Sequence, residues 1–598
     1  MNPQPPVTNM RIAAGTSSVA EAALLVSPPP SDAWESWKQS AAQIDWVPWI
    51  IVGLGAFLRL FLLDIKPPHF DEGINGWFVD QMVKSGFYRY DPTNYHGPLH
   101  FYILWACQTL LGRNLWAIRL PVVLGSIFSI HLTMKFEPFV GRNVSRLAAL
   151  AMAVSPGFVF YGRYSIHEVW LLLFSMLFIL GLLGLWQRGT VNYLWCAGMG
   201  LAGMILTKET YIIHLGCAVI AIFFTWLSRQ ITEARLSRMR WSAADLLIVL
   251  AAGVAVFISF YSGAFRVGYT FIAAFLTWIS RKITVHSRSL GAVRSPPVRH
   301  VRQSWTAADL IIVVGTGVAA IIFFYSGAFM NWPGLTGLYK TFEAWFKTGS
   351  QGAGHEKAWW YWLMLIARYE QPILVGLVLC VFCQLFKHVA LRYLAIYGVG
   401  TLIAYSIVKY KTPWCIISIV WPLLFVFGGL LVLVPSAFRR IAIIALSVLL
   451  AASLGLSVRL NYFRCTTQTE PYVYVQTYND VWKLTKPLLR LAKSNPTYYQ
   501  LIGHLIRTST YPLPWMLGDF TKVGYYEHNN MPDKLDGDFL LVQEDKIDEV
   551  EAKLHETYYT EPMTIREYQD PSKLYFNAKV FYRLFPGRTP EFKGKPAK

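Results

Sequence analysis

Long hydrophobic stretches separated by polar loops fill the chain from residue 47 to residue 458. A helix that crosses a bilayer needs about 20 mainly apolar residues. Stretches close to this length lie at 47–63, 117–135, 145–160, 168–186, 193–206, 211–227, 244–262, 269–280, 307–326, 371–387, 389–408, 414–434 and 441–458. The pattern therefore predicts an all-α polytopic membrane domain over residues 47–458, with about 13 transmembrane helices.

The segment 98–111 is shorter and begins beside two histidines, so its placement decides the topology. Positive residues in short loops mark the cytoplasmic side of a membrane protein. Basic loop residues recur at 142–146, 188, 229–240, 281–302, 387–392 and 439–440. All these loops become cytoplasmic if 98–111 lies on the membrane without crossing it. We therefore expect a multi-pass protein of the inner (plasma) membrane with a cytoplasmic N-terminus and an extracytoplasmic C-terminal region.

The two ends of the chain lack long hydrophobic stretches. Residues 1–46 are rich in Pro and Ser without a signal-peptide pattern, which predicts a disordered cytoplasmic tail. After the last span, "PYVYVQT" (471–477) and "DFLLVQE" (538–544) alternate as strands do, and 479–493 has helical spacing. Residues 459–598 are therefore expected to form a small extracytoplasmic α/β domain.

A helical hairpin is duplicated within residues 211–329. "TWLSRQIT" (225–232) matches "TWISRKIT" (277–284), and "WSAADLLIVL" (241–250) matches "WTAADLIIVV" (305–314). Each unit surrounds a basic loop, so an added copy preserves the topology downstream. Two copies are too few for a repeat array, and we interpret them as a local tandem duplication.

Composition supports a membrane protein. Hydrophobic residues make up 54% of the chain and charged residues only 15%, with a mean hydropathy of +0.37, whereas soluble domains carry about 25% charged residues. The net charge of +19 is unevenly placed and sets the topology, so membrane lipids are expected partners and nucleic acid is not. The seven cysteines lie mainly in apolar runs and imply no disulfide framework.

Two adjacent carboxylates, Asp71 and Glu72, follow the first hydrophobic stretch within "KPPHFDEG". Such a pair suits a general base that removes a proton from an acceptor hydroxyl. It equally suits a site that holds a divalent cation against a phosphate. A third interpretation is that Asp71 caps a helix over 74–84. Capping alone does not explain the pairing, so we expect both acids to be catalytic.

Five cations adjoin membrane ends on the predicted outer face, where positive residues are normally under-represented. They are Arg163, Lys208, Arg368, Lys409 and Lys411. Such cations usually mark an anion site, for which phosphate is a strong candidate. For any one of them the alternative is that it reaches lipid headgroups.

Further polar residues gather on the same predicted face. Glu168 begins a span, where an unpaired carboxylate is costly, and Arg163 or Lys208 is its simplest partner. Glu209 adjoins Lys208 and either pairs with it or contacts substrate. His96 lies four positions before a second histidine, so metal ligation is an alternative to substrate binding there.

One more histidine belongs to this set. His355 and Glu356, in "GHEKAWWYW" (354–362), are expected to contact substrate or to belong to a lid or interfacial anchor. No tight ligand spacing identifies a metal, so no cofactor is assigned and a divalent metal is left open.

These residues resemble the membrane glycosyltransferases with the GT-C fold. The chain looks most like the branch that includes protein O-mannosyltransferases and the lipid A aminoarabinose transferase, nearest to the flippase activity-associated glycosyltransferase-like family. The resemblance covers residues 47–545. It rests on "HFDEG", "HGPLHFY", "SPGFVFYGRYSIHE", "TKET", "GHEKAWWYW", "KYKTPW" and "YPLPW".

The resemblance implies a glycosyltransferase that moves a sugar from a polyprenyl-phosphate donor to an acceptor hydroxyl of a lipid, glycan or protein on the outer face. It implies that Asp71 is the base, that Glu72 supports it, and that Glu168 is the acid of the second external loop. Arg163 and Lys208 would hold the lipid phosphate, and the anomeric centre would be inverted. The second acid is more often Asp in this branch, and the duplicated hairpin is unusual.

Two other functions remain as alternatives. A flippase or transporter of lipid-linked sugars, or a factor associated with one, would line a path with its charges, but transporters usually place them near the bilayer midplane. A catalytically silent scaffold would tolerate replacement of Asp71 and Lys208.

Overall fold

The computed structural model describes residues 45–94, 96–235, 304–351, 354–527 and 530–595. The predicted disordered tail therefore lies almost entirely outside the described residues. So do the expected spans at 244–262 and 269–280 and most of the first copy of the duplicated hairpin. Residues 48–598 form one unit, and the expected domain boundary between 458 and 459 stays a prediction.

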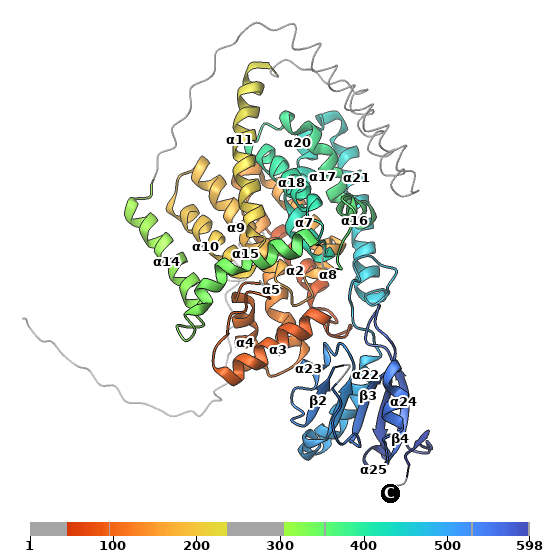
Figure 1. Ribbon diagram of the computed structural model, residues 1–598. Coiled ribbons are helices and arrows are strands. Elements are labelled where there is room, and N and C mark those ends of the chain that lie inside the picture. The colour runs from red at the N-terminus through yellow and green to blue at the C-terminus, as the bar shows by residue number, and fades with distance from the viewer. Residues whose placement is uncertain (1–44, 95, 236–303, 352–353, 528–529, 596–598) are drawn as a thin grey trace, which may run out of the picture. The chain divides into compact units, whose positions relative to one another are not determined.

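The first part of the described chain is helical (Figure 1). It comprises α2 (Val47–Leu60), α3 (Phe70–Ser85), α4 (Leu99–Leu111), α5 (Leu115–Met134), α6 (Glu137–Val140), α7 (Arg142–Val154), α8 (Pro156–Tyr161), α9 (Glu168–Gln187), α10 (Val191–Thr207), α11 (Tyr211–Arg235), α14 (Ala307–Tyr325), α15 (Pro333–Gln351), α16 (Tyr361–Tyr369), α17 (Gln371–Leu379), η1 (Cys380–Leu385), α18 (Val389–Ile407), η2 (Pro413–Cys415), α19 (Ile416–Gly428), α20 (Leu430–Leu433), η3 (Ser436–Phe438), α21 (Arg439–Val458) and η4 (Arg459–Phe463).

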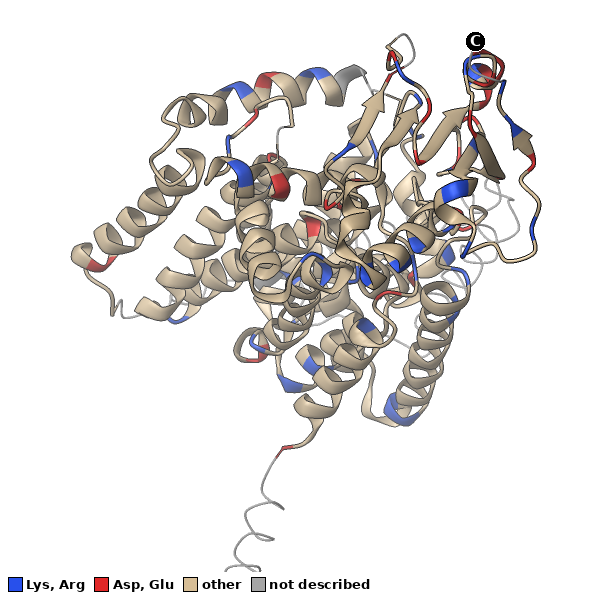
Figure 2. Cartoon of the chain, turned by 90° about the horizontal axis from the view of Figure 1, so that it is seen from below, with Lys and Arg blue, Asp and Glu red and all other residues tan. Residues whose placement is uncertain are grey.

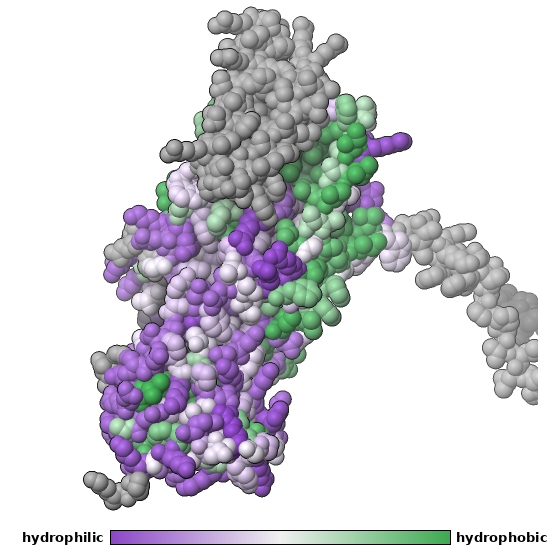
Figure 3. Space-filling model, turned by 90° about the vertical axis from the view of Figure 1, so that its right-hand side faces the viewer, coloured by the Kyte–Doolittle hydropathy of each residue, from purple (hydrophilic) through white to green (hydrophobic). Residues whose placement is uncertain are grey.

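Many of these helices are long and apolar enough to span a membrane. Among the described residues, seven qualify by length and hydropathy, or up to eight if one bent pair counts as a single span. Figure 2 shows long uncharged stretches of helical ribbon. On the face drawn in Figure 3 the largest hydrophobic area lies on the helical part. The predicted all-α membrane architecture is confirmed, and the count of about 13 spans stays a prediction.

The exposure of two helices explains where lipid would contact the protein. Only 11% of the most apolar window of α14 and 17% of that of the Ser436–Phe463 span are buried inside the protein. Their outward side chains include Ile311 and Ile444, both well exposed. In water such surfaces would be unfavourable, but lipid tails solvate them.

The span expected at 371–387 has an additional arm before it. The helix pair Tyr361–Tyr369 and Gln371–Leu385 bends by 119°. Pro372 lies in the first turn of α17, and a proline has no N–H with which to continue the hydrogen bonds of the preceding helix. The Glu370 carboxylate stabilises the bend, since it accepts hydrogen bonds from the Gly157 amide at 2.7 Å, the Ser155 hydroxyl and the Tyr472 hydroxyl.

The C-terminal part holds a small mixed sheet, as predicted. It comprises α22 (Val481–Ser494), η5 (Pro496–Gln500), β1 (Gly503–Ile506), α23 (Leu513–Met516), β2 (Val523–Tyr526), β3 (Phe539–Gln543), η6 (Glu544–Lys546), α24 (Ile547–Glu551), β4 (Thr557–Met563), β5 (Ser572–Asn577), α25 (Ala578–Phe581) and β6 (Phe592–Lys593). The strand order is β2-β1-β3-β5-β4-β6, with β1 parallel to β2 and β3 and the other pairs antiparallel.

Two of the three elements predicted here are present. The helix expected over 479–493 is α22, whose Leu484 and Leu488 are fully buried, and "DFLLVQE" contains β3. The strand expected over 471–477 is wrong. Tyr472 of that segment is instead buried against the helical part, so its apolar alternation serves packing and not a sheet.

The sheet-bearing part packs on α3 through two glycines. A Cβ added at Gly73 would lie 2.5 Å from Pro512, and one added at Gly76 would lie 2.3 Å from the Trp515 ring. These glycines are three positions apart and so share one helix face. The "YPLPW" segment (511–515) fills that face, which is the role of a structural corner. This contact brings the C-terminal part next to the first turn of α3.

Candidate active site

The start of α3 is fixed by a capping box. His69 is the N-cap residue, and its Nδ1 accepts a hydrogen bond from the Asp71 amide at 3.1 Å. The Glu72 carboxylate accepts one from the His69 amide at 2.8 Å. These bonds satisfy donors that a helix start otherwise leaves free. The cap is therefore His69, and the interpretation of Asp71 as the cap is wrong.

Glu72 is fully buried and fully engaged. Its two oxygens accept hydrogen bonds from Arg119 at 2.8 and 2.6 Å, and one also accepts from the Ser165 amide at 2.9 Å. Burial alone would raise the pKa of Glu72, but the Arg119 charge and these bonds lower it to about 2. Glu72 therefore has no oxygen free to take a proton from a substrate, and the support that it is expected to give Asp71 stays a prediction.

Asp71 has the opposite environment. Its side chain is 32% exposed, and within the described part of the chain its carboxylate accepts no hydrogen bond. The nearest ion-pair candidate is His69, at 3.8 Å. Burial lowers the pKa of His69 against the effect of Asp71. Since Nδ1 accepts from the Asp71 amide, Nε2 carries the proton and donates to the Tyr474 carbonyl at 2.9 Å. Asp71 is thus an uncommitted carboxylate beside a neutral imidazole.

Two loops bring His355 towards this carboxylate. The Lys411 amide donates to the His355 carbonyl at 3.1 Å and the Lys357 amide to the Lys409 carbonyl at 3.4 Å, around an antiparallel bridge. His355 Nδ1 lies 2.6 Å from the Tyr474 hydroxyl. Burial lowers the pKa of His355, and the charge of Asp71 opposes this shift. His355 therefore belongs to the surroundings of Asp71.

The cations predicted near this site differ in their availability. Lys411 Nζ donates to the carbonyls of Val408, at the end of α18, and of Lys357, the latter at 3.2 Å. Arg368 pairs with Glu470 at 3.2 Å. Both are engaged in the fold. Lys409 is exposed.

Arg163 lies in the interior. It donates to the carbonyls of Leu58, Phe61 and Leu62 at 3.0, 2.7 and 2.5 Å, and to the Tyr462 hydroxyl at 3.2 Å. Carbonyls at a helix end need such donors. The structure thus corrects the expected phosphate contact of Arg163, because its guanidinium holds the end of α2.

A second cluster forms around Lys208. Lys208 Nζ pairs with Glu168, as expected, and lies 4.0 Å from the Cys415 sulfur. The neighbouring Glu209 carboxylate lies 3.1 Å from His96 Nδ1. Glu168, Lys208 and Glu209 are each at most 5% exposed, whereas 26% of the His96 side chain is exposed. The cluster is a closed network with one accessible edge.

The histidines at this cluster do not form a ligand set for a metal. His100 Nε2 lies 3.3 Å from the Asn75 amide nitrogen, and His100 Nδ1 accepts from the Trp170 indole at 3.0 Å. Its ring packs against that of His167 in a tilted arrangement, with the ring centroids 4.3 Å apart. Among the described residues, no group of three or more His, Cys, Asp and Glu side chains could hold a metal ion.

Four contributors were not singled out from the sequence. Arg119 holds Glu72, and Tyr474 lies between His69 and His355. Lys357 is a cation near His355, and Arg566 is a cation near Asp71. Lys357 stands in the quoted motif "GHEKAWWYW" and could have been named. Tyr474 lies in "PYVYVQT", which was predicted as a strand, so its pattern did not point to the site. Arg119 and Arg566 come from segments without a distinctive pattern, and only the fold brings them here.

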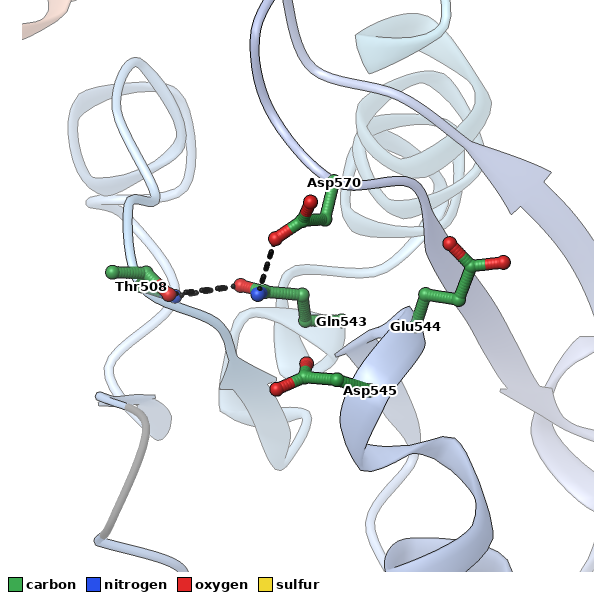
Figure 4. Close-up of a pocket in the computed structure, with 5 residues that line it drawn as sticks. All are labelled: Thr508, Gln543, Glu544, Asp545 and Asp570. Carbon is green, nitrogen blue, oxygen red and sulfur yellow. Dashed lines mark hydrogen bonds between the residues drawn. The ribbon is translucent and has the colours of Figure 1, made fainter.

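Two cavities lie outside both clusters. The first, of about 570 Å³, is lined by Thr508, Gln543, Glu544, Asp545 and Asp570 in the C-terminal part (Figure 4). There the Gln543 amide accepts from Thr508 at 3.0 Å and donates to Asp570 at 2.9 Å. The second, of about 360 Å³, lies between α11, η1 and α18. Neither is lined by a predicted site residue.

Comparisons with known proteins point to one fold. Residues 95–261 match the family model described as dolichyl-phosphate-mannose-protein mannosyltransferase. The crystal structure of ArnT from Cupriavidus metallidurans bound to undecaprenyl phosphate is similar over 91% of this chain and 98% of that one, with 12% identity and a TM-score of 0.51. At this identity the likeness concerns the fold alone.

A weaker similarity links the chain to another membrane enzyme. The Archaeoglobus fulgidus oligosaccharyltransferase in complex with Zn and sulfate matches over 89% of this chain and 73% of that one, with 11% identity and a TM-score of 0.43. None of the curated proteins compared with this sequence matches it significantly.

Proposed function

We propose a reaction for this chain, which is an integral membrane protein with the GT-C fold of membrane glycosyltransferases. It transfers a sugar from a polyprenyl-phosphate donor to an acceptor hydroxyl at the extracytoplasmic face. The uncommitted carboxylate of Asp71 carries the proposal. Support also comes from the mannosyltransferase family model and from the undecaprenyl phosphate bound by the similar ArnT structure.

Asp71 is the proposed general base. Its carboxylate takes the proton of the acceptor hydroxyl, and the acceptor oxygen forms a bond to the anomeric carbon of the sugar. The bond from that carbon to the donor phosphate breaks, and the lipid phosphate leaves with the electron pair. Attack opposite the leaving group inverts the anomeric centre. A base of this kind needs access and a free lone pair, and Asp71 has both whereas Glu72 has neither.

The donor phosphate is proposed to bind Lys357 and Lys409. These residues are opposite neighbours across the two loops, because the Lys357 amide donates to the Lys409 carbonyl. Like charges directly opposite are destabilising, and no ion pair is found for either lysine in the described part of the chain. A phosphate between them would relieve the repulsion and would stabilise the charge that grows on the leaving group.

The Lys208 cluster is proposed to shape the site and to contact substrate at its accessible edge. His96 is the member with an exposed side chain. Lys208 would have to give up Glu168 before it could bind a phosphate, and separating a buried ion pair is costly. Glu168 and Glu209 therefore act as the counter-charges of Lys208 in this scheme. The phosphate of the sugar donor is contacted by the two loops that carry Lys357 and Lys409.

Proteoliposomes with a labelled polyprenyl-phosphate sugar and an extract of membrane acceptors test the proposal. The wild-type chain should move label into a glycosidic product, and Asp71→Asn should lower transfer by about 10²–10⁴-fold while keeping the same thermal unfolding midpoint. Undiminished transfer by Asp71→Asn would reject the base. If labelled sugar donor crosses the bilayer and no glycosidic product forms, the protein is a transporter and not a transferase.

A further inference from the structure

Arg566 places a cation of the C-terminal part beside the first turn of α3. It lies in the loop between β4 and β5, and its backbone pairs with Thr477 in an antiparallel bridge. Its guanidinium carbon lies 3.7 Å from the centre of the Phe70 ring. Phe70 is the first residue of α3 and the neighbour of Asp71. The C-terminal part therefore reaches the proposed base through this arginine.

The guanidinium of Arg566 is only partly satisfied. Nη2 donates to the Ser509 hydroxyl at 3.3 Å, but Nη1 is buried and has no hydrogen-bond partner among the described residues. No carboxylate of the described chain lies within ion-pair distance of it. Burial lowers the pKa of Arg566 to about 10, and Asp71 is the charge that opposes this shift. The Arg566 guanidinium thus has an unpaired hydrogen-bond donor at the site.

We propose that Arg566 binds an anionic group, a phosphate or a carboxylate, on the acceptor molecule. The proposal rests on the proposed function, since it names a substrate class for the same site. The Arg566 guanidinium and the Asp71 carboxylate would then hold one acceptor at two points, its charged group and its reacting hydroxyl. Arginine suits this role because its planar fork matches the oxygens of phosphate and carboxylate.

Inversion at the anomeric carbon separates the groups that hold the acceptor from those that hold the donor phosphate. In a displacement with inversion, the base and the acceptor approach opposite the leaving group. The acceptor and the leaving phosphate therefore need separate cations. The proposed function assigns Lys357 and Lys409 to the phosphate, which leaves Arg566 for the acceptor. We therefore assign the unpaired N–H group of Arg566 to the acceptor substrate and not to the sugar donor.

The change of charge during the reaction favours the same assignment. When Asp71 takes the acceptor proton it becomes neutral, and the nearest counter-charge of Arg566 disappears. A half-buried guanidinium without a counter-charge is unfavourable. An anionic group on the acceptor keeps Arg566 neutralised throughout the transfer, whereas an uncharged acceptor would not.

Binding of inorganic phosphate to the full-length chain in nanodiscs tests the proposal without catalysis. Saturating undecaprenyl phosphate first occupies the donor site. Wild type should then bind inorganic phosphate, Arg566→Gln should bind it about tenfold more weakly, and Arg566→Lys should lie between them. Arg583→Gln, an exposed arginine of the same part, is the matched control and should resemble wild type. Unchanged phosphate affinity in a folded Arg566→Gln variant would overturn the proposal.

Transfer assays identify the source of the anionic group. Labelled product in the lipid phase with anionic phospholipid vesicles indicates a headgroup acceptor, and labelled product in the aqueous phase with soluble phosphorylated sugars indicates a soluble acceptor. In either case Arg566→Gln should raise the KM for acceptor more than it lowers kcat. An uncharged acceptor should be used equally by wild type and Arg566→Gln, whereas an unchanged KM of Arg566→Gln for the anionic acceptor contradicts the proposal.

The two proposals fail separately. Normal transfer by Asp71→Asn would refute the base and would leave the phosphate-binding result standing. Normal phosphate binding by Arg566→Gln would refute the acceptor contact and would leave the role of Asp71 standing.

Discussion

Asp71 and Glu168 occupy similar local positions with opposite surroundings. Each lies in the first turn of a helix beside an N-cap histidine, His69 for α3 and His167 for α9. The Asp71 side chain is 32% exposed and its carboxylate accepts no hydrogen bond from the described residues. Glu168 is 2% exposed, pairs with Lys208 and lies 3.7 Å from the Cys415 sulfur.

The difference teaches that availability, and not the presence of charge, separates a reactive group from a structural one. A buried carboxylate that has its counter-ion gains little from reacting, since removal of either partner leaves an uncompensated charge. An exposed carboxylate with free lone pairs can accept a proton from a substrate. We therefore expect changes at Asp71 to affect transfer and changes at Glu168 to affect stability.

The largest effect on transfer is expected at the exposed carboxylate of Asp71. Asp71→Asn removes the proposed base and keeps the shape of the side chain, so transfer should fall by about 10²–10⁴-fold. The unfolding midpoint should stay within error of wild type, because no hydrogen bond to this carboxylate is lost. Single-turnover transfer with labelled donor measures the first quantity and thermal unfolding in detergent the second. A large loss of stability in Asp71→Asn would show that Asp71 has a structural role, as Glu168 does.

A change at the buried carboxylate of Glu168 should affect stability more than transfer. Glu168→Gln leaves the Lys208 ammonium buried without its counter-ion, which should destabilise the protein by about 3–5 kcal/mol. Adding Lys208→Met removes the stranded charge and should recover most of that loss. Thermal unfolding of the two single variants and the double variant gives the coupling between them. Additive losses would show that the two groups act independently.

The sequence predicted the membrane part well because its signal is local. Hydrophobic length places a span wherever lipid solvates the side chains, so α9, α14 and α18 lie where expected. The sequence also narrowed the partner of Glu168 to Arg163 or Lys208, and the structure shows that it is Lys208. The strand over 471–477 failed because its alternation is equally compatible with packing on the helices.

The division of labour within Asp71 and Glu72 could not be predicted. Neighbours on a helix point about 100° apart, so the two can have different surroundings, but the residue types do not show which one is buried. That choice is made by Arg119, which lies 47 positions along the chain from Glu72. Arg566 is a stronger case, because only the packing of the C-terminal part on α3 brings it near Asp71.

The third effect concerns the two loop lysines. Lys409→Gln or Lys357→Gln should weaken binding of undecaprenyl phosphate by about tenfold, since each removes one charge-assisted contact to phosphate. Without ligand, either variant should be as stable as wild type or slightly more so, because the repulsion across the loops is relieved. Lys411→Gln is the comparison, since its ammonium binds backbone carbonyls. Lys411→Gln should lower stability without specifically weakening the binding of undecaprenyl phosphate.

The smallest effect appears only in acid. Because the pKa of folded Glu72 is about 2, below its usual 4.5, the folded protein binds fewer protons than the unfolded chain between these values. The stability that Glu72 contributes is therefore fully present above about pH 4.5 and decreases as the pH falls towards 2, by at most about 1.4 kcal/mol per pH unit. Glu72→Gln should flatten this part of the stability curve, whereas Asp71→Asn should leave it steep, and an equal flattening by both would remove the distinction between the buried and the open carboxylate.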